Sequence, residues 1–495
     1  MKLVDLFDSV AAQHGHRRFL TWGDGRAATY EDVARVVERQ ASELRAAGLA
    51  GRLLMLMARN RPELVTLWLA GQRAGTTVVF LNSALTATEV GRIAEDLQPA
   101  LIVAEPQAGA GAPAAPLVRL DDPPDVRVVA VPDVGRALAG AAPDGTAAVV
   151  LTSGSTGRPK YVAVPHAAYV AKGTLNALRL GWSPNDRAYC VMPLFHVGAQ
   201  CETLAPAIAA GAAVHLAPTF SSSDLWAELA RLGITHLHAT GSLLAMALAR
   251  GDPPPGLGLR RIVASLRADV AGPLSDALPN TDLITLYGLT ECPLGTLATP
   301  GEPYRPGWVG YPYTGWSGLR IVDDVGRRVP DGEPGEIQLR NVSCTPGYLA
   351  GTADSPFTDD GWLRTGDIGR RAGGGLFLTG RIKEMIRRSG ENIAPAEVEE
   401  VALRHPAVVE AAALPFADPV RDEEVWLCVE AAGAIDPAEL REFMAHDLAG
   451  FKLPRYVDVL AELPKTATNK VDKAALAALR ERPAWDAQAG HRAPS

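Results

Sequence analysis

The feature that constrains the fold most is an alternation of strand and helix patterns over residues 29–104. Thr29 has the side chain of a helix N-cap, apolar residues recur after it at helical spacing, and Gly48 ends the helix. The patterns that follow are, in chain order, a strand over 52–57, a helix over 60–75, a strand over 76–81, a helix opened by the capping box of Thr86 and Glu89, and a strand over 100–104. Such alternation predicts an α/β fold in which helices cover both faces of a parallel sheet.

The remainder of the chain divides into segments that differ in composition and in their predicted secondary structure. Residues 108–125 are rich in Ala, Gly and Pro and predict a surface excursion, after which strands and helices alternate again. From about 307 to 379, short strand patterns separated by Asp-Gly, Gly-Glu and Pro-Gly turns predict a small antiparallel, barrel-like subdomain. The order helix, strand, strand, helix, strand then predicts a small α+β unit. We therefore expect an N-terminal domain over 1–382 and a mobile C-terminal domain over 383–495.

Composition excludes several classes of protein. The net charge is −8 and the chain has no basic run, which argues against nucleic acid as a partner. The five cysteines are scattered and lack a C-x-x-C pair, so a disulfide framework is not expected and a reducing cytoplasm fits. Acidic residues close to Met1 argue against a secretory signal, and Gln72 and Arg73 interrupt the most apolar window, so no membrane span is expected.

A segment rich in serine and glycine, Thr-Ser-Gly-Ser-Thr-Gly-Arg-Pro-Lys at residues 152–160, follows an apolar strand pattern over 147–151. We name this segment the Ser/Gly loop. Glycines let the backbone approach a ligand closely, and successive N–H groups in such a loop can hold an anion. Further donors and a full positive charge come from Ser153, Ser155, Thr156 and Lys160. The segment differs from the G-x-x-x-x-G-K-[ST] loop, and a flexible linker has the same composition, so the loop alone leaves both readings open.

Five further segments follow in a fixed order. They are Met192-Pro-Leu-Phe-His196, Tyr287-Gly-Leu-Thr-Glu291, Trp362-Leu-Arg-Thr-Gly-Asp367, Thr379-Gly-Arg-Ile-Lys383 with Ser389-Gly-Glu-Asn-Ile393, and Leu463-Pro-Lys-Thr-Ala-Thr-Asn-Lys470. With the Ser/Gly loop, they resemble the adenylate-forming superfamily of acyl-CoA synthetases, peptide-synthetase adenylation domains and luciferases. The resemblance covers nearly the whole chain, and within the superfamily it points to fatty-acyl and crotonobetaine/carnitine CoA ligases.

The resemblance implies a ligase that works in two half-reactions. A carboxylate attacks the α-phosphorus of ATP, pyrophosphate leaves, and the thiol of CoA then displaces AMP from the acyl-adenylate. Glu291 is implied to hold Mg²⁺, a hard cation that prefers carboxylate oxygen. The residues implied to hold the nucleotide are Thr152, Ser153, Gly154, Ser155, Thr156, Gly157 and Lys160 around the β- and γ-phosphates, Thr290 at the α-phosphate, Tyr287 and Gly288 at the adenine, Asp367 at the ribose, and Arg381 at the ribose or a phosphate.

Lys470 is the residue implied to stabilise the charge that develops on the α-phosphate, because a placed ammonium in a water-poor site does this most strongly in the transition state. The family usually has glycine before this lysine, whereas this chain has Asn469, which tolerates left-handed backbone. Lys383 matches the family hinge, about which the C-terminal domain pivots between the half-reactions. Gly390 is implied to line the pantetheine tunnel.

The acid pocket is implied to involve Phe195, His196, Gly241 and Leu266. Relatives usually have Ser-Gly-Gly-Ala-Pro at residues 265–269, where this chain has Ser-Leu-Arg-Ala-Asp, and they differ near Gly241 and at Tyr161. These departures fall on the substrate side and predict an unusual acid.

Ordinary alternatives remain for single residues: a structural histidine at 196, a solvated helix start at 291, a turn aspartate at 367, a surface arginine at 381 and a tail lysine at 470. Alternatives also remain for the whole protein. The acceptor can be a phosphopantetheine carrier protein instead of CoA. The acid can be a non-carboxylate such as nitrite, transferred to an amine. The chain can also be a non-catalytic nucleotide-binding homologue.

Overall fold

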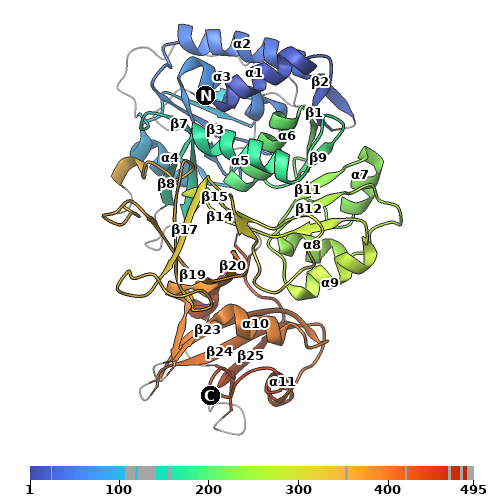
Figure 1. The fold of residues 1–495 in the computed structure, drawn as a ribbon, viewed down its shortest axis with the longest axis vertical. Helices are drawn as coiled ribbons and strands as arrows, with labels where there is room; N and C mark the ends of the chain where they lie inside the picture. The colour runs from blue at the N-terminus through green and yellow to red at the C-terminus, as the bar shows by residue number, and fades with distance from the viewer. Residues whose placement is uncertain are drawn as a thin grey trace.

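The computed structural model describes residues 1–23, 25–105, 117–120, 141–153, 159–351, 355–388, 391–418, 421–466, 470–479 and 483–487. In these ranges the strands form two large α/β sheets, two antiparallel sheets and a C-terminal sheet. Figure 1 shows the first α/β sheet at the top of the molecule, β11 and β12 of the second on the right beside the antiparallel strands, and the C-terminal elements at the bottom. None of the helices in the described ranges combines the length and the apolar character needed to cross a bilayer.

The first α/β sheet has the order β6-β5-β3-β4-β7-β8 and confirms the alternation predicted for residues 29–104. Thr29 and Thr86 cap their helices through capping boxes with Asp32 and Glu89. The elements are α2 (Tyr30–Ala46), β3 (Leu53–Met57), α3 (Pro62–Ala74), β4 (Thr77–Leu81), α4 (Ala87–Leu97), β5 (Leu101–Ala104), β6 (Leu117–Arg119), β7 (Thr146–Ser153) and β8 (Pro159–Pro165). Except for the antiparallel pair of β7 and β8, neighbouring strands are parallel.

One sequence prediction in this region is corrected for the residues that the structure describes. Residues 108–125 were expected to form a surface excursion, yet β6 pairs with β5 and extends the sheet. The reason is that β6 has only three residues, Leu117, Val118 and Arg119, which is too short for a periodic pattern to be detected. The other residues of that segment, apart from Leu120, lie outside the described ranges.

The second α/β sheet has the order β13-β12-β11-β9-β10-β1-β2. Its strands are β1 (Arg18–Trp22), β2 (Arg26–Thr29), β9 (Arg187–Cys190), β10 (Ala213–Leu216), β11 (His236–His238), β12 (Arg261–Val263) and β13 (Asp282–Ile284). Its helices are α1 (Leu3–His14), α5 (His166–Arg179), the π-helix η1 (Ala199–Leu204), α6 (Ala205–Ala210), α7 (Leu225–Leu232), α8 (Gly241–Leu248) and α9 (Ala268–Ala277). The two sheets share one core, in which the rings of Trp68 and Tyr169 meet edge to face at 4.8 Å.

The antiparallel strands predicted between residues 307 and 379 are confirmed, but antiparallel pairing already begins at residue 286. These strands are β14 (Leu286–Leu289), β15 (Cys292–Leu297) and β16 (Tyr311–Pro312) in one sheet, and β17 (Ser317–Val322), β18 (Gly335–Asn341), β19 (Leu363–Ala372) and β20 (Gly375–Arg381) in the other. The short η2 helix (Leu349–Gly351) lies between β18 and β19 in the chain.

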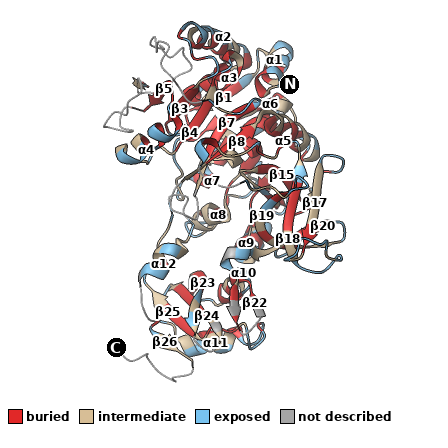
Figure 2. Cartoon of the chain, turned by 90° about the vertical axis from the view of Figure 1, so that its left-hand side faces the viewer, coloured by how far each residue is buried: buried red, intermediate tan, exposed pale blue. Residues whose placement is uncertain are grey.

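The C-terminal sheet has its own core, built around residues such as Val398, Leu427 and Val457. Its elements follow the short η3 helix (Ile382–Glu384) and are β21 (Ile386–Arg388), β22 (Glu391–Ile393), α10 (Pro395–Ala402), β23 (Val408–Asp418), β24 (Asp422–Ala431), α11 (Pro437–Met444), β25 (Tyr456–Leu460), α12 (Lys473–Leu479) and β26 (Trp485–Asp486). Figure 2 shows buried strands inside this unit and its helices on the outside. The predicted α+β order is confirmed.

Candidate nucleotide and acid site

The Ser/Gly loop is the connection of an antiparallel hairpin. Its first strand is β7 and its second is β8, with Thr152 opposite Lys160 and Ser153 opposite Pro159. Thr152 and Lys160 are half-buried at the base of the loop. The residues between them that were predicted to hold phosphate, Gly154, Ser155, Thr156 and Gly157, lie outside the described residues, as does the side chain of Ser153. Phosphate binding by this loop therefore stays a prediction.

Glu291 and Thr290 form the tight turn that joins β14 to β15, not the helix start that was the alternative for Glu291. The Tyr348 hydroxyl donates to Oε1 of Glu291 at 3.0 Å, and Nζ of Lys160 lies 4.9 Å from the centroid of the Tyr348 ring. Burial and then the Glu291 carboxylate raise the pKa of Tyr348 above its ordinary value. Tyr348 thus connects the base of the Ser/Gly loop to the predicted metal ligand. The motifs do not include Tyr348, so sequence reasoning missed it.

The chemistry of this corner is compatible with Mg²⁺. The described residues hold no cluster of three or more His, Cys, Asp or Glu side chains suited to a metal ion. A cation here would therefore be held by the half-buried Glu291 carboxylate together with phosphate oxygens and water. Mg²⁺ is usually bound in this way, by one or two carboxylates plus substrate phosphates.

Asp367 is the centre of a second group of predicted residues, contributed by β14, β19 and β20. Its side chain is buried, with the residue 4% exposed, and it accepts hydrogen bonds from the Tyr287 hydroxyl at 2.8 Å and from Nε of Arg381 at 2.7 Å. Burial, with the Asp367 charge next, raises the pKa of Tyr287 well above its ordinary value. The structure therefore brings three of the residues predicted to hold the nucleotide into direct contact.

The packing of the hairpin explains why residue 288 is glycine, without any contact to adenine. A Cβ at this position would lie 2.7 Å from the carbonyl oxygen of Pro293 on the facing strand, too close for any side chain. The hairpin of β14 and β15 therefore requires glycine here, and an adenine role for Gly288 stays a prediction.

His196 lies in the segment after β9, with its ring centroid 4.5 Å from that of Phe195. Burial, and after it the positive charge of Lys470, lower the pKa of His196 to about 4. The imidazole is therefore neutral at pH 7. Lys470 is exposed, and its segment is tied to Thr466, whose N–H donates to the Lys470 carbonyl at 2.7 Å. The C-terminal unit thus presents Lys470 close enough to His196 for its charge to act there.

The low pKa of His196 predicts an acid-sensitive fold. Since the folded pKa lies below the unfolded value of about 6.5, the unfolded chain binds a proton that the folded chain does not as pH falls from 6.5 towards 4. Stability is lost across that window, with a slope that corresponds to one proton for this histidine. We expect the free energy of unfolding of His196→Gln, measured with denaturant, to fall less steeply between pH 7 and pH 4.5 than that of the unchanged protein. The exposed His16, changed to Gln, is the control; a slope unaltered in His196→Gln would contradict the assignment.

Two of the predicted acid-pocket residues, Gly241 and Leu266, lie close together where α8 begins. Gly241 follows the N-cap Thr240, and a Cβ on Gly241 would lie 2.5 Å from the Ser265 carbonyl oxygen. The start of α8 therefore packs directly on the stretch that contains Leu266, whose carbonyl accepts from the Tyr304 hydroxyl at 3.2 Å. The close approach explains why this chain has glycine at 241.

His238 is a residue near the pocket that sequence reasoning missed. It ends β11, and its Cε1 lies 3.0 Å from where a Cβ of Gly198 would stand, two residues after His196. Its Nδ1 is buried with no hydrogen-bond partner among the described residues, and burial lowers its pKa. Only the alternation of His236 and His238 along the strand hints at it in the sequence.

Two residues at which this chain departs from the resembled family, Tyr161 and Arg267, make structural contacts. Tyr161 is buried in β8, and its hydroxyl donates to Asp96 on α4 at 2.7 Å. Arg267 donates to Glu410 on β23 at 2.7 Å, across to the C-terminal unit. The expectation that the departures gather on the substrate side stays a prediction.

Lys383 lies in η3, between β20 and β21, where the chain passes from the antiparallel strands to the C-terminal sheet. Its side chain and the whole of Gly390 lie outside the described residues. The hinge and the pantetheine tunnel stay predictions.

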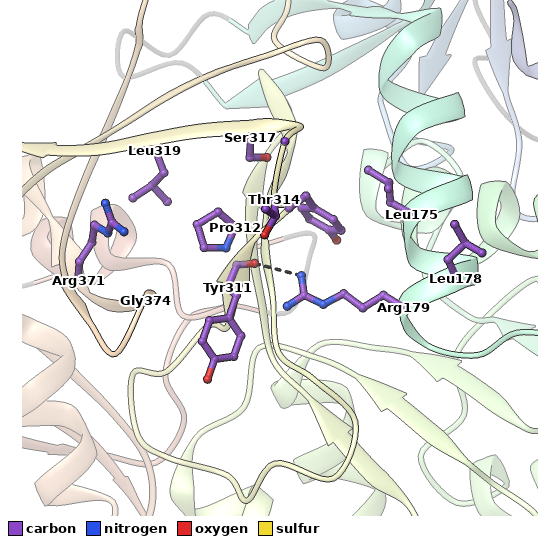
Figure 3. Close-up of a pocket in the computed structure, with 12 residues that line it drawn as sticks. Leu175, Leu178, Arg179, Tyr311, Pro312, Thr314, Ser317, Leu319, Arg371 and Gly374 are labelled. Atoms are coloured by element: carbon purple, nitrogen blue, oxygen red, sulfur yellow. Dashed lines mark hydrogen bonds between the residues drawn. The ribbon is translucent and has the colours of Figure 1, made fainter.

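A cavity of about 820 Å³ lies apart from all of these residues, between α5 and the strands β16, β17 and β19. Figure 3 shows Arg179 reaching from α5 to the Tyr311 carbonyl, to which it donates at 3.2 Å. The Arg179 guanidinium also lies 5.4 Å from the centroid of the Tyr313 ring. None of the predicted site residues lines this cavity.

The comparisons with known proteins agree over nearly the whole chain. The family model described as AMP-binding enzyme matches residues 7–349, and that of its C-terminal domain matches residues 397–470. A sulfoacetate–CoA ligase of Cupriavidus necator is 34% identical over 340 residues, which cover 67% of this chain and 66% of that ligase. An indoleacetate–CoA ligase of Aromatoleum aromaticum is 31% identical over 478 residues, 90% of this chain and 92% of that ligase.

Among solved structures, ATP-bound MatB from Rhodopseudomonas palustris superimposes with a TM-score of 0.83 at 24% identity, over 96% of this chain and 98% of that one. This likeness shows the shared fold. The match of the two family models in chain order, together with the relatives, establishes the family. The chain belongs to the AMP-binding enzyme family of adenylate-forming acid–thiol ligases.

Proposed function

We propose that this enzyme activates a carboxylic acid with ATP as an acyl-adenylate and then transfers the acyl group to the thiol of CoA. The observation that supports this most is the contact of Asp367 with Tyr287 and Arg381, because all three are residues predicted to hold the nucleotide. The charge of Lys470, on the C-terminal unit, contributes after burial to the low pKa of His196. The CoA ligases among the relatives, which are named for sulfoacetate and indoleacetate, support the acid and the acceptor.

Asp367 is suited to bind the ribose. A carboxylate offers about four acceptor positions and no donor. Tyr287 and Arg381 use one oxygen each and fix the orientation of the group. The remaining acceptor positions are available for the two ribose hydroxyls, which are donors.

Charge neutralisation makes the first bond change possible, because the acid and the triphosphate are both anions. Lys160 and the N–H groups of the Ser/Gly loop bind the β- and γ-phosphates, and Glu291 holds the magnesium ion. When bound, Mg²⁺ supplies positive charge to the phosphate oxygens. The neutral His196 donates an N–H to the carboxylate of the acid and orients it.

The two half-reactions balance as follows. A carboxylate oxygen of the acid forms a bond to the α-phosphorus, the bond from that phosphorus to the bridging oxygen breaks, and pyrophosphate leaves with the electron pair. Lys470 stabilises the charge on the α-phosphate oxygens while this happens. The CoA thiolate then attacks the acyl carbon, and AMP leaves with the carboxylate oxygen that had joined it to the acid.

A pivot at Lys383 separates these steps in our proposal, with domains over 1–382 and 383–495. Lys470 must be at the site for the first step and away from it when the thiol enters. The variant Lys383→Pro is expected to retain ATP–pyrophosphate exchange and to lose most thioester formation, because proline fixes one of the backbone angles that must change. The two rates are measured separately in one preparation; unchanged thioester formation would exclude a hinge at this residue.

The test of the function is acid-dependent exchange between ATP and radiolabelled pyrophosphate across a panel of acids, followed by CoA consumption with the acids that support exchange. We expect exchange with a carboxylic acid and Mg²⁺, and one AMP released for each CoA consumed. If the acyl group is transferred to a phosphopantetheine carrier protein and not to CoA, the carrier protein is the acceptor and the proposed acceptor is wrong. If only nitrite supports exchange, the activated acid is not a carboxylic acid. If no acid supports exchange, the chain is a non-catalytic nucleotide-binding protein.

A further inference from the structure

The C-terminal unit and the N-terminal part are joined by a chain of charged groups that runs from α9 to the segment of Lys470. Arg267 precedes α9, and its NH1 donates to Oε1 of Glu410 on β23 at 2.7 Å. The other oxygen of Glu410 accepts from Nζ of Lys465 at 2.9 Å. Lys465 stands five residues before Lys470 in the sequence.

Arg267 is held in place for this contact from its own side. Its Nε and NH2 donate to the two oxygens of Asp269 at 3.1 and 3.0 Å, which leaves NH1 directed at Glu410. Because the bonds to Asp269 already fix the plane of the guanidinium, the side chain loses little further conformational freedom when it also binds Glu410. Each of the three guanidinium nitrogens thus donates to a carboxylate.

The three side chains of this contact are partly buried, so solvent screens their charges less than it would on an open surface. The side chains of Arg267, Glu410 and Lys465 are 34%, 17% and 25% exposed. Burial raises the pKa of Glu410, but the charges of Arg267 and Lys465 outweigh it and hold that pKa below its ordinary value. The carboxylate is therefore ionised at neutral pH and both contacts are charge-assisted.

Lys465 transmits the contact to Lys470 through the backbone. Lys465 forms a β-bridge with Val471, and the N–H of Thr466 donates to the Lys470 carbonyl at 2.7 Å. The Lys470 N–H in turn donates to the Thr466 hydroxyl at 3.2 Å. The backbone next to Lys465 is therefore bonded to that of Lys470 and Val471, and fixing Lys465 restrains Lys470.

We propose that Arg267, Glu410 and Lys465 form an inter-domain latch that positions Lys470 for acyl-adenylate formation and that must open before thioester formation. The proposal rests on the proposed function and deepens it. The three are positioning residues, because they act through Lys470.

The kinetic test compares the two half-reactions in Arg267→Gln, Glu410→Gln and the double variant. We expect pyrophosphate exchange to fall about tenfold, a moderate inter-site coupling, with unchanged KM for ATP and acid. Thioester formation from a supplied acyl-adenylate should stay at or above the wild-type rate. The double variant should be no slower than either single one, since both remove the same contact. The variant Arg267→Lys should restore part of the rate, and Arg404→Gln, which breaks ion pairs inside the C-terminal unit, is the control.

Other kinetic outcomes would overturn the latch. A raised KM for the acid in Arg267→Gln would make this arginine a substrate contact. Equal losses in both half-reactions would show a merely structural role. Fully additive losses in the double variant would show that Arg267 and Glu410 act separately.

A distance measurement tests the latch without any reaction, so its failure is distinct from failure of the proposed function. Spin labels are placed on cysteines introduced at the exposed positions Ser275 on α9 and Glu439 on α11. We expect one dominant distance in the otherwise unchanged protein, and a broader or second distribution in Arg267→Gln and at high salt, which screens the ion pairs. Identical distributions in both proteins would overturn the latch even if the enzyme is active.

Discussion

Replacement of Lys470 by alanine is expected to slow acyl-adenylate formation by about 10²–10³-fold, the cost of removing one donor that stabilises transition-state charge. Thioester formation from a supplied acyl-adenylate should remain close to the wild-type rate, because the ammonium acts on the α-phosphate only in the first step. The expectation follows from the role that the resemblance implies for Lys470, whose charge contributes, after burial, to the low pKa of His196.

The measurement is single-turnover release of pyrophosphate, compared with CoA-dependent release of AMP from supplied acyl-adenylate. Lys452→Ala is the matched control, because Lys452 pairs with Glu397 on the same unit at 2.6 Å and has no predicted role. Equal losses in both steps would mean that Lys470 supports the domain rather than the reaction. No loss in the first step would remove its proposed role.

Replacement of Asp367 by asparagine is expected to raise the KM for ATP by about 10–100-fold, the range set by hydrogen bonds to a charged group. The amide would turn a donor towards either the Tyr287 hydroxyl or the Arg381 guanidinium, both of which donate to this side chain. The amide also has only one oxygen, so one of the two oxygens that accept hydrogen bonds from the ribose hydroxyls is lost.

Steady-state kinetics at saturating acid give the KM for ATP, and thermal unfolding of the same samples shows whether the fold is retained. Asp359→Asn, at an exposed position, is the control. The variant Tyr287→Phe separates orientation from ribose binding, since it keeps the carboxylate and removes only one of its partners. A folded Asp367→Asn protein with a normal KM for ATP would contradict the ribose assignment.

Much of the fold is predictable because its signals are local. The capping boxes at Thr29 and Thr86 and the apolar periodicity between them are contained in short windows, and the structure confirms the helices and strands they predict. The antiparallel return of β8 beside β7 is different, since it depends on which strands pair rather than on periodicity. For the same reason the short β6, which has three residues, was missed.

The candidate site divides in the same way. Residues that belong to contiguous motifs, such as Asp367 and Glu291, are found from the sequence through the resemblance. Tyr348 contacts Glu291 from 57 residues away, and Glu410 contacts Arg267 from 143 residues away. No short pattern links such partners, because they meet only when separate elements pack. Sequence reasoning accordingly supplied the chemistry, and the structure supplied the residues that orient it.

The central claim is that a carboxylate oxygen of the acid attacks the α-phosphorus of ATP. It is tested most directly with an acid that supports exchange, labelled with ¹⁸O in its carboxylate and converted to the CoA thioester. Mass spectrometry of the products should find one ¹⁸O atom in AMP and none in pyrophosphate. Label in pyrophosphate or inorganic phosphate, or ADP as the nucleotide product, would contradict the account.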